Sequence, residues 1–387
     1  MKHNILTSTI LLCMLPFAIH AQEKETLKIE ASNDTYVYGG VITDHTPGRL
    51  KSAPFPVGAA VSIDNLKNNS KYREAIAREY TSITAENAMK MGSIWQSRER
   101  YNFRDVDYLV DFAEQNQLRV HGHCLVWYKK SSTSMPQFVQ DLHNSGWGTK
   151  EEWKQLMKDY IQTVVGRYKG RVASWDVVNE SIKDDGTERS EDIWREHIGY
   201  PEYIDWAFQC AHEADPDALL FYNDYGYDYA AAKRTKTDEL IRGMLDRGIP
   251  IHGYGIQAHI DLPNRSEGKF KAAIDQAKRL GIMIHISEID IKCNPDEDAS
   301  VTYTEDLQKK QAGLYNEVCA SMMNVSESKR FGITQWNVSD ASSGLSKNPD
   351  WPYLLGSNYE PKTPAYDYFV KGFSGVYIPW NQVIINP

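Results

Sequence analysis

The pattern of apolar and polar positions changes character near Pro54. Residues 32–50 are rich in Gly, Thr, Asp and Pro and follow no clear period, so we interpret 22–49 as an extension that leads into or wraps the folded domain. Beyond this point, short runs of β-branched and small residues, which are typical of strands, alternate with longer amphipathic stretches. Strands are predicted over residues 55–61, 80–86, 119–127, 174–179, 218–223, 252–259, 283–290 and 331–338.

Each predicted strand is followed by a predicted helix. Val106, Leu109, Val110 and Ala113, for example, have the spacing that places them on one face of a helix. Strands that alternate with helices indicate an α/β protein with a parallel sheet. Helices are predicted over residues 71–79, 103–117, 150–168, 202–214, 233–247, 269–280, 305–323 and 364–372.

Eight consecutive strand–helix units predict a single (β/α)8 TIM barrel over residues 50–372. A doubly wound open sheet is the structural alternative. It is disfavoured because no Gly-rich phosphate-binding loop follows the first predicted strand. Residues 373–387 remain as a C-terminal tail, for which the simplest interpretation is packing against the outside of the barrel.

The first 21 residues are typical of a secretory signal peptide. Lys2 precedes an apolar run over 5–19, and the small residue Ala21 follows it. The run is too short for a stable membrane-spanning helix. We therefore expect cleavage after Ala21 and a mature protein outside the cytoplasm, either secreted, periplasmic or at the cell surface.

Composition narrows the class of ligand. The 387 residues carry a formal net charge of −9, which argues against nucleic-acid binding because phosphate recognition needs clustered positive charge. The chain is rich in aromatic residues, with 23 Tyr, 11 Phe and 10 Trp. Such a surplus suits a cleft that stacks on flat ligands such as sugar rings.

The cysteines do not indicate a metal site. Cys124, Cys210, Cys293 and Cys319 would remain after signal cleavage, and their spacing is not typical of zinc ligands. An oxidising compartment permits disulfides, but the sequence does not choose among the three full pairings. Alternation along a strand places His121 and His123 on one face and Cys124 on the other, so we expect no metal there.

The predicted strands become polar at their C-terminal ends. In a parallel barrel these ends meet at one rim, where catalytic residues gather. Because buried charges are costly unless they are paired or used, this rim predicts an active site. The residues in question are Glu86, Asn87, His123, Trp127, Asn179, Glu180, Asn223, Asp224, Tyr225, Gln257, His259, Glu288, Asp290 and Trp336.

Several of these residues also have a structural interpretation. Asn223 and Asp224 taken singly are better explained as caps of a helix or turn. Trp127 and Trp336 could belong to the core, and His259 could be a structural histidine. The recurrence of such residues at seven of eight strand ends favours a functional rim.

Glu180 and Glu288 form the strongest pair, because they end the fourth and seventh predicted strands. Two carboxyl groups on one rim can flank a glycosidic bond, with one protonating the leaving oxygen and the other attacking or activating water. A separation of roughly 5–5.5 Å would retain the anomeric configuration, and roughly 6.5–9.5 Å would invert it. This chemistry implies no cofactor and no metal.

Motifs around these residues give the chain a family resemblance. They occur in one order between residue 50 and about residue 369, and together they are highly specific. The chain resembles glycoside hydrolase family 10, the retaining endo-β-1,4-xylanases with a (β/α)8 fold. The motifs are FPVGAAV at 55–61, TAENAMK at 84–90, GHCLVW at 122–127, WDVVNE at 175–180, FYNDY at 221–225, GIQAH at 255–259, SEID at 287–290 and WNVSD at 336–340.

The resemblance implies a role for each matching residue. Glu180 would be the general acid/base and Glu288 the nucleophile, which His259 and Asp290 would orient and keep ionised. Asn179 would bond the 2-hydroxyl of the sugar at the cleavage point. The other implied contacts are to sugar hydroxyls on the non-reducing side for Glu86, Asn87, Lys90, His123 and Gln257, to the sugar at the cleavage point for Trp127 and Trp336, and toward the leaving group for Asn223 and Tyr225.

The chain departs from the family pattern at three places. Tyr128-Lys129-Lys130 follows Trp127 where the family usually has His-Ser-Gln, and Met91 and Gly344 stand where Trp is usual. Lys130 and Gly344 could accommodate a decorated or acidic substrate such as glucuronic-acid-bearing xylan. Lys130 could equally be a solvated surface charge.

The sequence therefore predicts a secreted, retaining endo-1,4-β-xylanase that hydrolyses xylan by double displacement. We expect a monomer whose partner is the polysaccharide. One alternative is a hydrolase of the same fold that acts on a β-glucan or on a mixed-linkage or decorated xylan. A non-catalytic glycan-binding protein is less favoured, because Glu180, Glu288, His259 and Asp290 are all present.

Overall fold

The computed structural model describes residues 28–31, 34–37, 48–342 and 349–385. The predicted signal peptide over 1–21 and the departure at Gly344 lie outside the described residues. Within the described part of the chain, no helix has both the length and the apolar character needed to cross a membrane.

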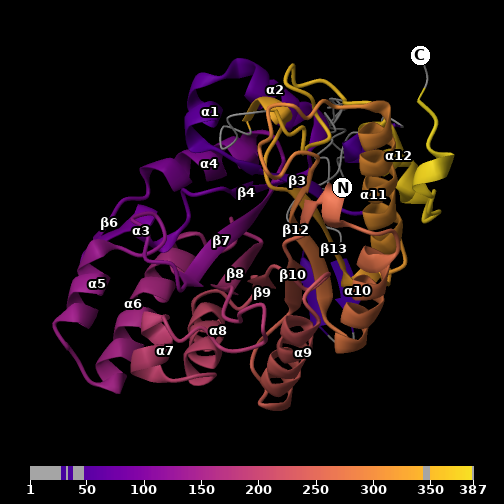
Figure 1. Ribbon diagram of the computed structural model, residues 1–387. Helices are drawn as coiled ribbons and strands as arrows, with labels where there is room; N and C mark the ends of the chain where they lie inside the picture. Colours follow the sequence, from indigo (N-terminus) through magenta and orange to yellow (C-terminus); the bar gives the residue numbers. More distant parts are fainter. Residues whose placement is uncertain (1–27, 32–33, 38–47, 343–348, 386–387) are drawn as a thin grey trace, which may run out of the picture.

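Eight parallel strands close into a barrel at the centre of the molecule (Figure 1). The barrel closes because β13 pairs with β3 and β10 pairs with β12, both in parallel register. The predicted (β/α)8 barrel is confirmed, and a closed sheet excludes the open doubly wound alternative. The barrel strands are β3 (Val57–Val61), β4 (Ser82–Ala85), β7 (Arg119–Trp127), β8 (Ser174–Asn179), β9 (Leu219–Asp224), β10 (Gly253–Ile256), β12 (Met283–Lys292) and β13 (Arg330–Gln335).

Helices surround the barrel (Figure 1), and their apolar stripes face inward. Val106, Leu109, Val110 and Ala113 are all buried, as their spacing predicted. The helices that follow the barrel strands at the predicted places are α2 (Ser70–Glu79), α4 (Arg104–Gln115), α6 (Lys150–Arg167), α8 (Glu202–Ala214), α9 (Ala231–Asp246), α10 (Lys269–Ala277), α11 (Glu305–Met323) and α12 (Ala365–Lys371).

Short elements in the strand-to-helix connections were not predicted, because a few residues carry too little periodicity to be recognised. They are the helices α1 (Ile63–Asn68), α3 (Met91–Ile94), α5 (Gln137–Asn144) and α7 (Ile193–Ile198), and the hairpin of β5 (Trp95–Ser97) and β6 (Arg100–Tyr101). Single 3-10 turns lie at η1 (Leu50–Ser52), η2 (Leu262–Asn264), η3 (Lys278–Leu280), η4 (Glu327–Lys329), η5 (Asp340–Ser342), η6 (Gly372–Ser374) and η7 (Trp380–Gln382).

The predicted sixth strand is interrupted in the structure. β10 ends at Ile256, and Ala258 then adopts a left-handed backbone conformation with φ of 62°. The chain resumes as β11 (His259–Asp261), which pairs with the end of β12 so that His259 lies opposite Asp290. A non-glycine residue with positive φ is uncommon, so the apolar pattern did not predict this break.

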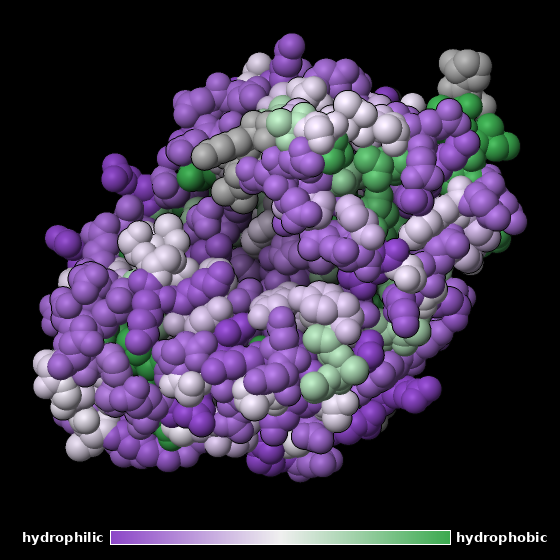
Figure 2. Space-filling model, viewed as in Figure 1, coloured by the Kyte–Doolittle hydropathy of each residue, from purple (hydrophilic) through white to green (hydrophobic). Residues whose placement is uncertain are grey.

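The described segments before and after the barrel lie outside it. Near the N-terminus, β1 (Lys28–Ala31) and β2 (Asp34–Val37) form an antiparallel pair within the predicted extension. The C-terminal tail packs on α11, where Val383 is buried beside Ala312 and Ile378 donates its backbone N–H to Asn316. Figure 2 shows hydrophobic residues at the upper right, where the C-terminal segment lies in the same view of Figure 1. Val376 and Ile384 in this segment are exposed.

The four cysteines of the barrel are free and buried. Burial raises the pKa of Cys210 and of Cys293 to about 12, so both are held as neutral thiols at ordinary pH. Their role in the described structure is that of small apolar side chains.

Candidate active site

A cavity of about 370 Å³ opens among the carboxyl ends of the barrel strands. Ten of the predicted site residues line it, whereas Glu86, Asn87, Asn223 and Asp290 do not. The lining comprises Lys90, His123, Trp127, Tyr128, Lys129, Asn179, Glu180, Tyr225, Tyr229, Gln257, His259, Glu288 and Trp336.

Glu180 follows the last residue of β8 and is only 8% exposed. Its carboxyl group accepts one hydrogen bond from Trp127 Nε1 at 3.1 Å and another from Gln257 Nε2 at 3.1 Å. Asn179 lies beside it, with its side-chain amide against those of Asn223 and Gln257. Neutral donors from the end of β7 and from the residue that follows β10 therefore hold this carboxyl group at the cavity wall.

Glu288 lies within β12 and is 4% exposed. Asn223 Nδ2 donates to its Oε1 at 2.7 Å, and His259 Nε2 lies 3.3 Å from its Oε2. His123 Nδ1 is 4.0 Å from the same carboxyl group. Two histidines and an amide donor thus surround Glu288.

His259 and Asp290 make the contact that the sequence predicted. His259 Nδ1 lies 2.9 Å from Asp290 Oδ2, while its Nε2 faces Glu288. Burial alone would lower the pKa of His259, but the two carboxylates outweigh it and raise the pKa to about 10. At neutral pH His259 is therefore an imidazolium that bridges the two acidic residues.

A buried layer lies beneath the cavity and is built around Asp176. His123 Nδ1 and His121 Nε2 lie 2.9 and 3.1 Å from Asp176 Oδ2, and His121 Nδ1 contacts Ser174 Oγ at 2.7 Å. Although burial alone would raise it, the two histidines lower the pKa of Asp176. Contacts with Cys124, Asp176 and Glu288 raise the pKa of His123 despite its burial. His121 and His123 share a carboxylate partner, which explains why both face inward.

One side of the cavity is built from the segment that follows β4. Lys90 Nζ donates to Asn87 Oδ1 at 2.9 Å and lies 5.0 Å from the centre of the Trp127 ring. Burial raises the pKa of Glu86, with Lys90 opposing the shift. Lys90 therefore connects Asn87 and Glu86, which are outside the lining, to the aromatic wall of the cavity.

Asn223 differs from its predicted place toward the leaving group. It is fully buried, does not line the cavity and donates to Glu288, while its Oδ1 accepts from Ser287 at 2.6 Å. Asn223 lies on β9 with its side chain directed between β8 and β12, and a contact with the leaving group stays a prediction. The structural interpretation holds for Asp224, which accepts from the Tyr225 backbone N–H and pairs with buried Lys233 at 2.7 Å.

Lys129, rather than Lys130, lines the cavity. Lys129 Nζ lies 4.8 Å from the Trp127 ring centre, whereas Lys130 is exposed and its backbone carbonyl accepts from Gln140. The sequence analysis assigned the change in the cavity to Lys130, because Lys130 stands at the position where the family usually has glutamine. β7 ends at Trp127, so strand alternation no longer determines where the next side chains point.

One residue that lines the cavity, Tyr229, and one that lies behind its wall, Arg189, were not predicted. Tyr229, which is 52% exposed, lines the side that Tyr225 shares. Arg189 lies behind the wall, where its Nη2 donates to Tyr225 Oη at 2.9 Å and its guanidinium stacks 4.0 Å from the Tyr128 ring centre. Both belong to irregular connections, which have no periodicity to mark them.

The arrangement supports acid–base chemistry with two unlike carboxyl groups. Glu180 is held by the neutral donors Trp127 and Gln257, and Glu288 by the cationic His259 together with Asn223. A glycosidase needs one carboxyl group that can carry a proton and one that stays ionised. The site provides these two environments on facing strands.

Comparisons with known proteins agree with this geometry. Residues 49–372 match the model of glycosyl hydrolase family 10. The endo-1,4-beta-xylanase B of Paenibacillus barcinonensis is 34% identical over 324 residues, covering 80% of this chain and 92% of that protein. The endo-1,4-beta-xylanase B of Thermotoga neapolitana is 37% identical over 313 residues, covering 78% of this chain and 83% of that protein.

Solved structures agree as well. Native xylanase 10B from Thermotoga maritima superposes with a TM-score of 0.73 at 34% identity, covering 84% of this chain and 96% of that chain. A family 10 structure from Paenibacillus barcinonensis gives a TM-score of 0.77 at 30% identity, covering 86% of this chain and 99% of that chain. With the family model matched over most of the chain, this protein belongs to glycosyl hydrolase family 10 and is a retaining glycoside hydrolase.

Proposed function

We propose that this enzyme is an endo-1,4-β-xylanase that hydrolyses internal bonds of xylan by double displacement. The observation that carries the proposal is that Glu180 and Glu288 face one cavity with different hydrogen-bond partners. The two relatives described above are endo-1,4-beta-xylanases, which supports xylan as the substrate.

In the first step, a Glu288 oxygen attacks the anomeric carbon while the bond from that carbon to the leaving oxygen breaks. Glu180 gives its proton to the leaving oxygen. His259 and Asn223 contact the Glu288 carboxyl group and hold it in position for this attack. Glu288 loses its charge on forming the glycosyl ester, so Glu180 then ionises more easily.

In the second step, the Glu180 carboxylate takes a proton from water, and the water oxygen attacks the anomeric carbon. The bond to Glu288 breaks and the carboxylate is restored. Two inversions at the same carbon return the original configuration. The products are two shorter β-linked chains.

Product analysis on a panel of xylans and β-glucans tests the substrate. We expect internal cleavage of β-1,4-xylan and proton NMR spectra in which the β anomer appears first. Cleavage of β-glucan in preference to xylan would contradict the proposed substrate, and initial formation of the α anomer would contradict double displacement.

Azide chemistry tests the assigned roles. With an aryl xylobioside that carries an activated leaving group, Glu180→Ala with azide should form the β-glycosyl azide, because azide replaces water in the second step. Glu288→Ala with azide should form the α-glycosyl azide, because azide replaces the nucleophile. Glu213→Ala, on the exposed face of α8, is the matched control and should keep wild-type activity. Full activity of either active-site variant without azide would contradict its assigned role.

The positive side chains of the cavity support a decorated xylan as one substrate. Lys90 and Lys129 both lie within 5.0 Å of the Trp127 ring centre. A carboxylate on a glucuronic acid branch would find an ammonium group there. Hydrolysis of glucuronylated xylan compared with unbranched xylan tests this, and slower cleavage of the glucuronylated polymer would contradict it.

We also propose that the mature protein is secreted and acts as a monomer. Secretion is supported by the signal-like pattern over 1–21. Fractionation of the host, with N-terminal sequencing of the mature protein, tests the location and the cleavage after Ala21. Light scattering after size-exclusion chromatography tests the monomer.

A further inference from the structure

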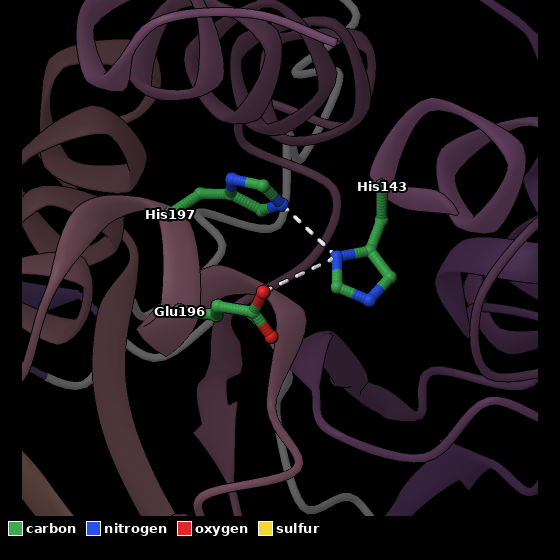
Figure 3. A group of neighbouring side chains, drawn as sticks. All are labelled: His143, Glu196 and His197. Atoms are coloured by element: carbon green, nitrogen blue, oxygen red, sulfur yellow. Dashed lines mark hydrogen bonds and ion pairs between the residues drawn. The ribbon is translucent and has the colours of Figure 1, made fainter. Parts of the chain in front are cut away.

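A second cluster of polar side chains lies away from the cavity, on the outer helices α5 and α7 (Figure 3). His143 comes from α5, and Glu196 and His197 come from α7. His143 Nδ1 lies 3.0 Å from His197 Nε2 and 3.9 Å from Glu196 Oε1. Two imidazoles and a carboxylate from separate parts of the chain therefore meet at one point.

A hydrogen bond between the histidines accounts for only part of this arrangement. His143 Nδ1 carries either one proton or one lone pair, so it cannot serve both His197 and Glu196. If that proton is donated to His197, the carboxylate at 3.9 Å faces no donor from His143. A cation between the three groups would satisfy all of them at once.

The spacing suits a small metal ion. One donor atom from each residue lies within 4.8 Å of the others. Zinc binds nitrogen and oxygen at about 2.1 Å, so two of its ligands lie at most about 4.2 Å apart. The separations of 3.0 and 3.9 Å from His143 both fall within that limit, and the exposed Glu196 side chain can turn to complete the set.

The site is also partly preorganised. The His197 ring stacks on Trp153 with centroids 4.0 Å apart and an interplanar angle of 8°. Trp153 is fully buried and donates from Nε1 to the Trp147 carbonyl at 2.8 Å, so its plane is held in turn. His143 and His197 are partly buried and Glu196 is exposed, which leaves room for water as a further ligand.

We propose that His143, Glu196 and His197 bind a divalent transition-metal ion of the zinc class. Imidazole nitrogen with one carboxylate oxygen is a donor set that such ions prefer over calcium or magnesium. This departs from the sequence prediction, which expected no metal. His143 and His197 lie 54 positions apart, and no spacing motif joins them.

Binding would connect two strand-to-helix units of the barrel. α5 follows the connection that carries Tyr128 and Lys129, and α7 follows the connection that carries Arg189. An ion held by both helices would join the two segments that form one wall of the cavity. It would stabilise the folded state by mass action and would take no part in the reaction.

Metal titration of the untagged, chelator-stripped full-length enzyme tests the proposal. Zinc chloride is titrated in competition with a chromophoric zinc chelator, and calcium chloride is titrated in parallel. We expect one equivalent of zinc to bind, the thermal midpoint to rise with zinc, and calcium to produce neither effect. His143→Ala and Glu196→Gln should each bind zinc at least about tenfold more weakly, since even loss of a residue that only supports a ligand costs about 10–100-fold.

A matched control variant and a measurement of folding distinguish loss of the metal site from other effects of the substitutions. His212→Ala removes another partly exposed helical histidine, on α8, and should bind zinc as the wild type does. Circular dichroism separates a lost site from a lost fold, and Glu196→Gln changes only exposed atoms. Less than one equivalent of zinc on the wild type, or equal affinity in His143→Ala, overturns the proposal and leaves a hydrogen bond between two imidazoles.

Discussion

Arg189 Nε donates to the backbone carbonyl of Glu180 at 2.7 Å. Glu180 has φ of 56°, a left-handed conformation that non-glycine residues adopt only when the surroundings impose it. The same guanidinium bonds Tyr225 and stacks on Tyr128, so one buried cation joins the acid to the wall beside it. Arg189 is thus a positioning residue for Glu180, the proposed proton donor.

Replacing Arg189 should weaken acid catalysis selectively. General acid–base catalysis contributes roughly 10²–10⁴-fold, so a displaced Glu180 in Arg189→Gln should lower kcat on xylan by at least about tenfold. The kcat/KM for dinitrophenyl xylobioside, which reports the first step and whose leaving group needs no proton, should be affected far less. A series of aryl xylobiosides of increasing leaving-group pKa measures this dependence.

The control for this series is Arg195→Gln, which removes a surface arginine paired with Glu188. It should follow the wild-type dependence on leaving group. If Arg189→Gln lowered the rate equally for every leaving group, Arg189 would serve substrate binding or general stability instead.

Asn223 should affect turnover rather than affinity. Its amide donates to Glu288 at 2.7 Å, and a hydrogen bond to a charged group is worth about 1.5–3 kcal/mol. Asn223→Ala should therefore lower kcat by roughly ten- to a hundredfold with little change in KM. Steady-state kinetics on xylo-oligosaccharides measures both, with circular dichroism to verify the fold. A raised KM at unchanged kcat would restore the original prediction of a leaving-group contact.

His259 should make stability depend on pH above neutrality. Its pKa is about 10 in the folded protein, against about 6.5 for an ordinary histidine. Because the folded pKa is the higher one, the stabilisation is complete below about pH 6.5 and is lost as pH rises toward 10. The difference in unfolding free energy between wild type and His259→Gln should therefore narrow from pH 6 to pH 10. Urea unfolding at several pH values measures it, and a constant difference would contradict the raised pKa.

Substitutions of Lys129 and Lys130 should have different effects on the hydrolysis of acidic xylan. Lys129 lines the cavity, and an exposed ion pair is worth roughly 1 kcal/mol or less, so Lys129→Gln should lower the ratio of rates on glucuronylated and neutral xylan by about two- to fivefold. Lys130 is exposed outside the lining, and Lys130→Gln should leave that ratio unchanged. The reverse result would return the specificity to Lys130.

Tyr229 should contribute to binding of long substrates. An aromatic contact is worth about 0.5–1.5 kcal/mol, so Tyr229→Ala should raise KM for xylohexaose by roughly two- to tenfold while kcat stays near wild type. Tyr108→Ala removes another exposed tyrosine, on α4, and should change neither constant. An unchanged KM in Tyr229→Ala would show that its ring is only a surface side chain.

The architecture could be predicted from the sequence because each strand and helix has its own periodicity of apolar and polar residues. β7, β8, α8 and α11 have the predicted bounds, and the polar residues at strand ends meet at one rim because parallel barrel strands share a direction. The positions of Glu180 and Glu288 at the cavity follow from that alone. The contacts of His259 with Asp290 and Glu288 were anticipated through the family resemblance.

What periodicity could not decide is where a side chain points once a strand has ended. Ala258 breaks the sixth strand and thereby sets His259 opposite Asp290, and the chain beyond Trp127 turns so that Lys129 faces the cavity. Asn223 reaches Glu288 because side chains from β8, β9 and β12 meet inside the barrel.

The sequence by itself determined the order of strands and helices, and it determined that the carboxyl groups of Glu180 and Glu288 lie at one rim. Both results follow from the spacing of residues within single segments of the chain. Only the tertiary structure decided the partners of those groups and the meeting of His143 with His197. Such contacts depend on the register and closure of the whole barrel, which bring together residues from segments that share no local period.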